Sequence, residues 1–464
     1  MLELPTLFPV HGAPPSLPLA GHALAMRRDP LRTITCLARE HGGMAPFRVG
    51  PLQGWLLSEP ALVGEVLVSK KKHYTRQTPV YRAMAEFLGA GILTTEGRDW
   101  RVHRRIVQPA FHKRRLARFA DRIASIGDES LAGWRGTFDV SEAMMRLTLR
   151  IVSEVLLGTR TDRDASDIGA AVADSQRYVE GVMSRVVPIP RFVPTASNRA
   201  FARSLKTLDR VAYGIIDERR RSGEVGDDVV SMLLEARYED GQPLSRERIR
   251  NELITLLAAG HETTSNALSW TLMRLSQHPT VARRMVDEVD EVLGGRAPSF
   301  EDLPRLTYTR WVFDEAMRLH PPAWVTGRLV TEHHELGGHP MPPGTFAMLA
   351  PYVTHRRPDL WDNPEGFDPD RWEALSTRGA LPPFTFYPFG GGSRKCVGEA
   401  FAYLEATILL AQIAQRFRLE LVGGHPIVPA PQITLGLASG LWMRVVPRGH
   451  APRERSEPAR PRAS

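Results

Sequence analysis

The stretch Phe389-Gly390-Gly391-Gly392-Ser393-Arg394-Lys395-Cys396-Val397-Gly398 decides the fold class of this chain. It is a glycine-rich loop that brings one cysteine to the start of a helix predicted over 398–417. Glycine lets the backbone turn tightly, and the free N–H groups at a helix start favour a thiolate over a thiol. Such a thiolate can ligate a soft metal or act as a nucleophile. From the loop alone, a buried structural cysteine is an equally good interpretation.

Three common motif interpretations fail on single residues. A dinucleotide-binding loop starting at Gly390 requires glycine where Lys395 stands, and a hydrolase nucleophile elbow around Ser393 requires glycine at the same position. His261-Glu262-Thr263-Thr264 opens like the helix of a zinc protease, but Ser265 occupies the position of the second histidine. The sequence therefore excludes these three kinds of site.

In the rest of the chain, apolar residues recur mostly at the spacing of a helix. The longest helical pattern begins after Ser245, a good N-cap, and ends at His278-Pro279. At ~1.5 Å per residue it makes a rod of roughly 50 Å, which must be a central helix. Further helices are predicted over 60–68, 100–111 with a break at Pro109, 164–183, 198–221 and 308–320. Alternating patterns over 325–330, 346–350 and 433–446 predict a minor sheet.

The ten-residue loop satisfies every fixed position of F-x-x-G-x-R-x-C-x-G and so resembles the cytochrome P450 haem-thiolate monooxygenases. Four other stretches resemble that family's motifs in the same order. They are Trp100-x-x-x-Arg104, Ala259-Gly260-His261-Glu262-Thr263-Thr264, Glu315-x-x-Arg318 and Pro369-Asp370-Arg371-Trp372. The resemblance runs from about Pro18 to Val446. It implies a mainly α-helical, triangular fold with small β-sheets and the long central helix over the haem.

The resemblance also implies the domain organisation and the site. One haem-thiolate catalytic domain is expected over 1–446, followed by a disordered basic tail over 447–464. Cys396 is expected to ligate the iron of haem b, and Glu262 and Thr263 to pass protons to iron-bound oxygen. The remaining contacts expected for the haem and its propionates come from Trp100, His103, Arg104, Ala259, Gly260, Arg328, Phe389, Arg394 and Gly398.

Two of these motifs also have an account from elementary chemistry. Ala259 and Gly260 remove bulk midway along the central helix, although glycine costs ~1 kcal/mol of helix propensity. The Thr263 hydroxyl can turn back to the carbonyl of Ala259, four residues earlier. Glu315 and Arg318 lie three apart on one helical face, and Arg371 is expected to complete a structural cluster of three charges.

The reaction implied by the resemblance is insertion of one oxygen atom from O₂ into a hydrophobic substrate, either a terpenoid or a fatty-acid-like molecule. The pocket is expected around 81–93, 258–263, 323–326, 434–438 and the two surface helices predicted over 164–183 and 198–221. Its apolar lining is expected from Phe87, Leu88, Leu257, Trp324, Val325 and Leu435. Three alternatives stay open: a peroxide-dependent peroxygenase, a non-catalytic haem-binding sensor, and an enzyme that rearranges its substrate. Dependence on a reductant separates the monooxygenase from all three.

Composition limits the partners and the compartment. Sixty Lys and Arg against 52 Asp and Glu give +8, too modest for this length to indicate a nucleic-acid partner. The two cysteines lie far apart in sequence, which favours a reducing compartment, and Cys36 is expected in the core. Without a long apolar run or a signal sequence, the expectation is a cytoplasmic monomer with no membrane anchor.

Electrons are expected from another protein, because the chain ends soon after the catalytic unit. The resemblance implies a ferredoxin or flavodoxin with its reductase, which passes electrons on from NAD(P)H. The expected docking surface is cationic and consists of Arg101, Arg105, Lys113, Arg114, Arg115 and Lys395. The histidines at 333, 334 and 339 flank Gly337-Gly338, so a hairpin turn explains them better than a metal site.

Overall fold

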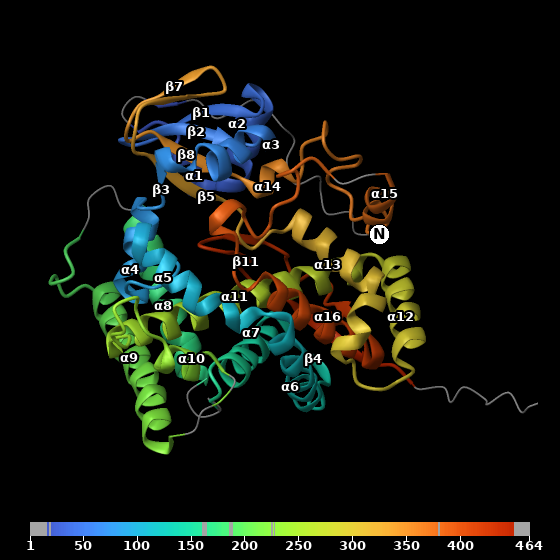
Figure 1. The fold of residues 1–464 in the computed structure, drawn as a ribbon. Coiled ribbons are helices and arrows are strands. Elements are labelled where there is room, and N and C mark those ends of the chain that lie inside the picture. Colours follow the sequence, from blue (N-terminus) through green and yellow to red (C-terminus); the bar gives the residue numbers. More distant parts are fainter. Residues whose placement is uncertain are drawn as a thin grey trace, which may run out of the picture.

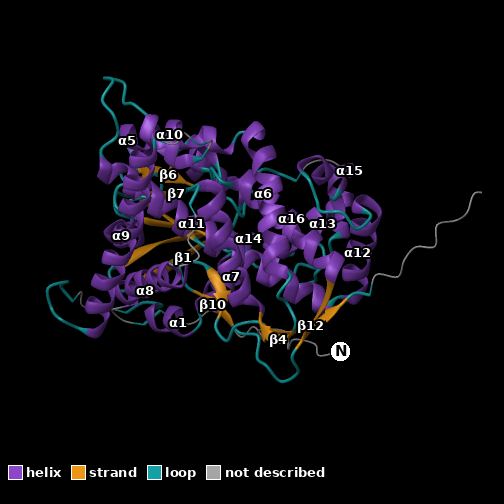
Figure 2. Ribbon diagram, turned by 90° about the horizontal axis from the view of Figure 1, so that it is seen from below, coloured by secondary structure: helices purple, strands orange, loops and turns teal. Residues whose placement is uncertain are grey.

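The computed structural model describes residues 16–17, 20–159, 165–184, 189–223, 226, 228–378 and 381–449. Helices dominate, and the strands gather mainly at one end of a roughly triangular outline (Figure 1). Seen from below, helices again fill most of the molecule (Figure 2). The expected mainly α-helical architecture is confirmed.

The helices of the first half of the chain are α1 (Ala23–Arg28), α2 (Pro30–His41), α3 (Pro60–Gly64), α4 (Pro79–Leu88), α5 (Gly97–Val107), α6 (Lys113–Leu131), α7 (Val140–Ile151), α8 (Ala165–Ser184) and α9 (Ala196–Ser222). Those of the second half are α10 (Val229–Glu235), α11 (Arg246–Gln277), α12 (Pro279–Leu293), α13 (Thr307–Leu319), α14 (Pro351–Thr354), α15 (Asp370–Arg378) and α16 (Glu399–Arg416). A single π-helical turn continues α3 to Ser69, and a 3₁₀ turn follows α5 at the predicted break.

Helix α11 is the predicted central helix. Its N-cap is Ser245, whose side chain accepts a hydrogen bond from the N–H of Arg248 at 3.2 Å. The helix has 32 residues, and it packs against α7, α9, α13 and α16. Pro279 begins α12 directly after it, because proline cannot continue the hydrogen-bond ladder of α11. Most side chains of α11 are buried, so exposed positions in its middle are informative.

The largest sheet joins distant parts of the chain. Its strands are β1 (Met44–Val49), β2 (Leu52–Leu57), β3 (Tyr74–Thr75), β5 (Thr326–Val330) and β8 (Phe346–Leu349), in the order β1-β2-β8-β5-β3. The pair β2 and β8 is parallel, with Gly54 opposite Phe346, and the other pairs are antiparallel. This sheet confirms the strands predicted over 325–330 and 346–350.

The strand pattern predicted over 433–446 corresponds to two separate strands. The segment divides into β11 (Leu435–Leu437), which pairs with β10 (Pro429–Pro431), and β12 (Trp442–Pro447), which lies between β4 (Gly136–Asp139) and β9 (Phe417–Leu421). Gly440 at φ +73° turns the chain between them, a conformation that favours glycine. The two halves therefore belong to different sheets.

The folded part also extends past the expected boundary at 446. Pro447 ends β12, and the Arg448 guanidinium lies 2.7 Å from the Asp290 carboxylate. The rest of the expected tail, 450–464, lies outside the described residues. The hairpin predicted at the histidines is confirmed, since β6 (His334–Leu336) pairs with β7 (His339–Met341). Among the described residues no group of His, Cys, Asp and Glu is arranged to hold a metal ion.

The predicted charge cluster lies at the end of α13. The Arg318 guanidinium donates two hydrogen bonds of 2.9 Å to the Glu315 carboxylate, and Arg371 donates a third, also of 2.9 Å. The Trp372 indole N–H donates a fourth at 3.1 Å. Glu315 and Arg318 are 0% exposed. The other Arg318 donors bind the carbonyls of His355, Pro364 and Gly366. The cluster thus ties α13 to the segment before α15.

Candidate active site

The loop before α16 is folded tightly around Cys396. Gly390 and Gly392 have φ near +70° and +63°, and a Cβ at Gly392 would overlap the carbonyl oxygen of Leu67. The Cys396 N–H donates to the carbonyl of Phe389 at 3.0 Å, which closes the loop. Gly398 is the N-cap of α16. Cys396 as a whole residue is nonetheless exposed.

The expectation that the loop alone favours a thiolate is wrong in direction. Burial among protein atoms raises the pKa of the Cys396 thiol, and it outweighs the Gly398 N–H and the charges of Arg104 and Lys395, which lower it. The helix start supplies one hydrogen bond, which is too little to offset the desolvation of a negative sulfur. A cation bound to the sulfur would stabilise the thiolate.

The middle of α11 has one exposed side. Ala259 is exposed, although most of the helix is buried, and Ala258, Glu262 and Thr263 are half-buried. The Thr263 hydroxyl donates to the Ala259 carbonyl at 2.8 Å, as predicted. Ala259 therefore leaves free space beside the helix, and the Thr263 hydroxyl lies at its edge.

Gly260 was expected to make room beside the central helix, but the structure gives another reason for a glycine at this position. A Cβ at this position would lie 2.9 Å from Cγ2 of Val152, in the π-helical turn that follows α7. Helix α7 makes one of the most extensive contacts of α11. Gly260 therefore permits close helix packing, and the room for a flat ligand comes from Ala259.

Glu262 lies at a junction of three elements. One of its carboxylate oxygens accepts a hydrogen bond from the side-chain amide of Gln176 in α8. The other accepts one from the hydroxyl of Thr434, in the turn between β10 and β11. The Asn266 amide, one turn further along α11, donates to the same hydroxyl at 2.9 Å. The hydroxyl of Thr434 is thus oriented toward Glu262.

A cluster of arginines lies close to the Cys396 loop. Burial, aided by Arg76, lowers the pKa of Arg328 to about 10 and that of Arg394 to about 9. Nη1 of Arg394 and Nε of Arg76 are buried without a hydrogen-bond partner. Unpaired buried cations are costly, so these groups require an anion.

Glu96 and Tyr81 complete this arginine cluster. The Glu96 carboxylate accepts a hydrogen bond of 2.6 Å from the Arg76 backbone N–H and lies 3.9 Å from Arg394. Arg76 donates to the Tyr81 hydroxyl at 2.6 Å. Burial alone would raise the pKa of Tyr81, but Arg76 and Arg328 bring it down to about 7. Trp100 covers the cluster, since its ring centre lies 4.0 Å from the Arg394 guanidinium.

Two expected haem contacts are engaged elsewhere. The imidazole of His103 pairs with Glu252 through Nδ1 and contacts the Arg248 guanidinium through Nε2 at 2.6 Å. Both ring nitrogens are used, so His103 connects α5 to α11. Arg104 donates to the Lys395 carbonyl at 2.7 Å and stands near Cys396 rather than in the arginine cluster.

These residues fit a haem with a thiolate ligand. Three guanidinium groups, those of Arg76, Arg328 and Arg394, face one carboxylate, that of Glu96, which leaves two positive charges for two propionates. Cys396 is an exposed residue, and a bound cation would stabilise its thiolate. Ala259 leaves room beside the central helix. Donor chemistry, charge and space thus agree with one another.

A comparison with protein families decides the matter, since the profile of the family described as Cytochrome P450 matches residues 12–439. The chain belongs to the cytochrome P450 family. It is a P450 monooxygenase, and its cofactor is the thiolate-ligated haem of that family. Among the residues that the structure describes, this P450 has no helix long and apolar enough to cross a membrane.

Several Streptomyces proteins are similar to this P450 over nearly its whole length. A cyclooctatin synthase of Streptomyces melanosporofaciens is 40% identical, with 91% of this chain and 93% of the relative covered. A cyclooctat-9-en-7-ol 5-monooxygenase of the same organism is 35% identical, covering 89% and 90%. A pentalenene oxygenase of Streptomyces avermitilis is 32% identical, covering 94% and 97%.

The apolar residues expected to line the pocket divide into two groups. Phe87, Leu88 and Leu257 belong to the main core, whereas Trp324 and Leu435 belong to the core beneath the five-stranded sheet, with Val325 packed against it. Phe87, Leu88 and Leu435 are at most 1% exposed, so almost none of their surface is open to a ligand. Val325 is half-buried and has surface left for one.

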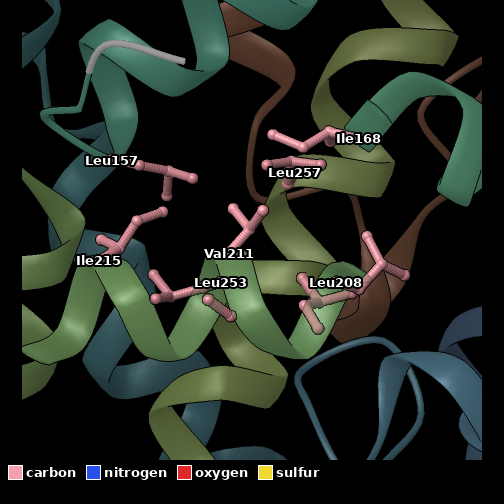
Figure 3. A pocket seen from close by; sticks show the side chains of 9 residues that line it. Leu157, Ile168, Leu208, Val211, Ile215, Leu253 and Leu257 are labelled. Atoms are coloured by element: carbon pink, nitrogen blue, oxygen red, sulfur yellow. The ribbon is translucent and has the colours of Figure 1, made fainter. Parts of the chain in front are cut away.

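Leu257 borders a small cavity on the α9 side of α11. Together with Leu253 it lines a small apolar cavity of about 10 Å³, which Leu208, Val211 and Ile215 of α9 close from the other side (Figure 3). The cavity has no polar lining and is barely large enough for one water molecule. It lies between α11 and α9, so it is a packing gap under the helices that cover α11.

Sequence reasoning missed Arg76 and Glu96, and it gave no individual role to Tyr81 or Gln176. Arg76 and Glu96 lie in loops without a recognisable motif, and their importance comes from contacts with Arg394 and Arg328, more than 200 residues away. Gln176 lies on the half-buried side of an otherwise ordinary amphipathic helix. Tyr81 and Thr434 do fall in segments that were expected to line the pocket.

Proposed function

We propose that this P450 hydroxylates a terpenoid, using electrons from an acidic redox protein. The observation that carries the proposal is the side of α11 at Ala258 and Ala259, where small apolar side chains are followed by the polar pair Glu262 and Thr263. This arrangement offers an apolar surface to a substrate and a proton route next to it. The three Streptomyces relatives, whose names refer to cyclooctatin, cyclooctat-9-en-7-ol and pentalenene, support the terpenoid class over a fatty acid.

A spectral titration tests the substrate class. Pentalenene, cyclooctat-9-en-7-ol and a long-chain fatty acid are added to the purified ferric protein, and the shift of its Soret band is followed. We expect at least one terpenoid to shift the band at micromolar concentration and to be oxidised when reductant and a ferredoxin system are supplied. A shift with the fatty acid alone would overturn the terpenoid assignment. Oxidation that needs no reductant would overturn the monooxygenase route.

The residues that would hold the haem follow from the site. Cys396 would ligate the iron, and Arg76, Arg328 and Arg394 would bind the propionates, with Trp100 packed beside them. The Tyr81 hydroxyl, which accepts from Arg76, would add a further polar group to the propionate site. When bound, the haem supplies the activation of O₂ by an electron-rich thiolate-ligated iron.

Proton supply is assigned to Glu262 and Thr263. The Thr263 hydroxyl is anchored to the Ala259 carbonyl, so its oxygen can accept from a water molecule on the exposed side of α11. Glu262, the residue before it, is held by Gln176 and Thr434 and can exchange protons with the same water. The two residues order water next to the substrate surface, where protons are consumed.

Replacing Thr263 with alanine is expected to uncouple the enzyme. Folding and substrate binding should persist, because alanine suits a helix, while the hydroxyl that orders the water molecule is lost. We expect product per reductant oxidised to fall at least about tenfold, with hydrogen peroxide released instead. Both pentalenene and cyclooctat-9-en-7-ol are needed, because a substrate hydroxyl can replace that of Thr263.

The matched control for this uncoupling experiment is Thr264→Ala. Thr264 makes the same kind of hydrogen bond, to the Gly260 carbonyl at 3.1 Å, but is buried. It should leave coupling unchanged. Parental coupling in Thr263→Ala with both substrates would show that protons travel by another route.

The redox partner is proposed to dock on the cationic surface formed by α5, the start of α6 and the Cys396 loop. Arg101, Lys113 and Arg114 are exposed there. The side chain of Arg105 lies 3.3 Å from Glu239, and that of Lys395 lies 2.6 Å from Glu399, so these two charges are partly neutralised. The exposed trio is therefore the best place to test attraction of an acidic ferredoxin or flavodoxin.

Lys113→Glu combined with Arg114→Glu is expected to slow reduction by an acidic ferredoxin about tenfold at low ionic strength. The difference should shrink at high salt, because salt screens the attraction. Stopped-flow reduction rates measure this effect. Arg203→Glu, an exposed charge reversal on α9, is the control, and substrate affinity should not change in any variant. Equal rates for the parent and the double variant at low salt would remove this surface as the docking site.

A further inference from the structure

Glu180 is a second carboxyl group near Glu262, and it has no role in the proposed proton route. It lies in α8, four residues after Gln176, so both side chains project from the same side of that helix. Gln176 donates to Glu262. Glu180 is half-buried and therefore lies between the interior and the solvent.

The turn between β10 and β11 connects the two carboxyl groups. The backbone N–H of Ile433 donates to Glu180, and the hydroxyl of the next residue, Thr434, donates to Glu262. Asn266 fixes that hydroxyl from α11 at 2.9 Å. Two consecutive residues of one turn therefore bind Glu180 and Glu262 and hold them near each other.

The charges around the pair favour a proton on Glu180. Burial raises the pKa of Glu180, and the nearby Glu262 carboxylate raises it further, while the Ile433 N–H and Arg177 act in the opposite direction. His261, next to Glu262 in α11, adds little positive charge near neutral pH, because burial lowers its pKa. Glu262 accepts one hydrogen bond on each of its carboxylate oxygens.

We propose that Glu180 is a positioning residue that reloads Glu262 with protons from the solvent side of α8. The proposal rests on the proposed role of Glu262 and Thr263. The Glu180 carboxyl releases a proton to the Glu262 carboxylate, becomes negative itself, and then takes up a proton from solvent. The pair carries one negative charge before and after the transfer, so no buried charge is created.

The test is Glu180→Gln, which keeps the size of the side chain and an oxygen to accept from Ile433 but cannot ionise. In the parent, product formation should fall as the pH rises through the raised pKa of Glu180, because the reservoir is then empty. In Glu180→Gln we expect product formation at low pH to be about tenfold lower than in the parent, without this pH dependence. That loss is smaller than the hundredfold or more that removal of a general acid itself causes. Glu180→Asp restores an ionisable group and should restore the pH dependence.

An infrared readout is independent of turnover. The ferric haem-loaded parent should gain a protonated-carboxyl band when the pH is lowered, and Glu180→Gln should lack that band. Asp167→Asn, an exposed carboxylate at the start of the same helix, is the control and should match the parent in both measurements.

The outcomes separate this proposal from the proposed function. If Glu262→Gln slows turnover while Glu180→Gln keeps the parental pH profile and infrared band, the role of Glu180 is overturned and the route through Glu262 stands. If Glu262→Gln also has no effect, the route itself is wrong, and the proposal fails with it.

Discussion

Arg318→Ala is expected to lower the free energy of unfolding by about 3–5 kcal/mol, the largest stability loss foreseen for a single substitution in this chain. The guanidinium is fully buried and binds Glu315 through two parallel hydrogen bonds. Alanine removes both bonds and leaves the carbonyls of His355, Pro364 and Gly366 without this donor. Glu315 keeps Arg371 and Trp372 but loses one of its two counter-charges. Leaving a buried charge short of its partner is the costly part.

Denaturant unfolding followed by circular dichroism measures this loss. Arg318→Lys keeps the charge but cannot form the planar fork, so it should still destabilise the protein clearly. Arg146→Ala is the control, because Arg146 pairs with Glu142 at i, i+4 on the surface and should contribute less than ~1 kcal/mol. A loss below ~1 kcal/mol for Arg318→Ala would mean that the cluster is not structural.

Cys396→Ser is expected to abolish both the red-shifted Soret band of the reduced carbon monoxide complex and product formation. Serine has nearly the same size, so the loop that Gly390, Gly392 and the Phe389 carbonyl close around it should persist. An alcohol is far less acidic than a thiol and donates less electron density to iron. The loss therefore reports the ligand atom and not a misfolded loop.

Cys36→Ser is the matched control for the ligand assignment. Cys36 is the other cysteine of the chain and lies buried in α2. Its replacement should leave the Soret band and turnover unchanged, with at most a small loss of stability. A parental spectrum in Cys396→Ser, or a changed one in Cys36→Ser, would contradict the assignment.

Features that depend on nearby residues were predictable from the sequence. The central helix follows from the Ser245 cap and the His278-Pro279 end, and the Thr263 hydrogen bond follows from a spacing of four residues in a helix. The Glu315 cluster was predictable because Arg318 is three residues away, and the family motif supplied Arg371. In each case, local geometry determines most of the contact.

Features that depend on burial or on distant contacts were not predictable. The direction of the Cys396 pKa depends on how many protein atoms surround the sulfur, which the loop sequence does not reveal. The close approach of Val152 decides the role of Gly260, and the two residues are over 100 positions apart. His103 was expected to contact the haem because it lies beside Arg104 in the sequence, but its imidazole pairs with the buried Glu252. Arg76 shows its importance only beside Arg328 and Arg394.

The parallel pairing of β2 with β8 has a consequence for how the protein is made. Gly54 pairs with Phe346, which is synthesised about 290 residues later, so this part of the sheet cannot form before then. At roughly 5–20 residues per second, the ribosome needs about 15–60 s to synthesise the intervening chain. During that time the apolar face and the unpaired edge of the β1–β2 hairpin stay exposed, which invites association with other nascent chains. Arg328 and Arg394 are synthesised late as well, so the haem pocket cannot be assembled until nearly the whole chain exists. Haem supplied during expression, rather than afterwards, should therefore raise the yield of folded enzyme.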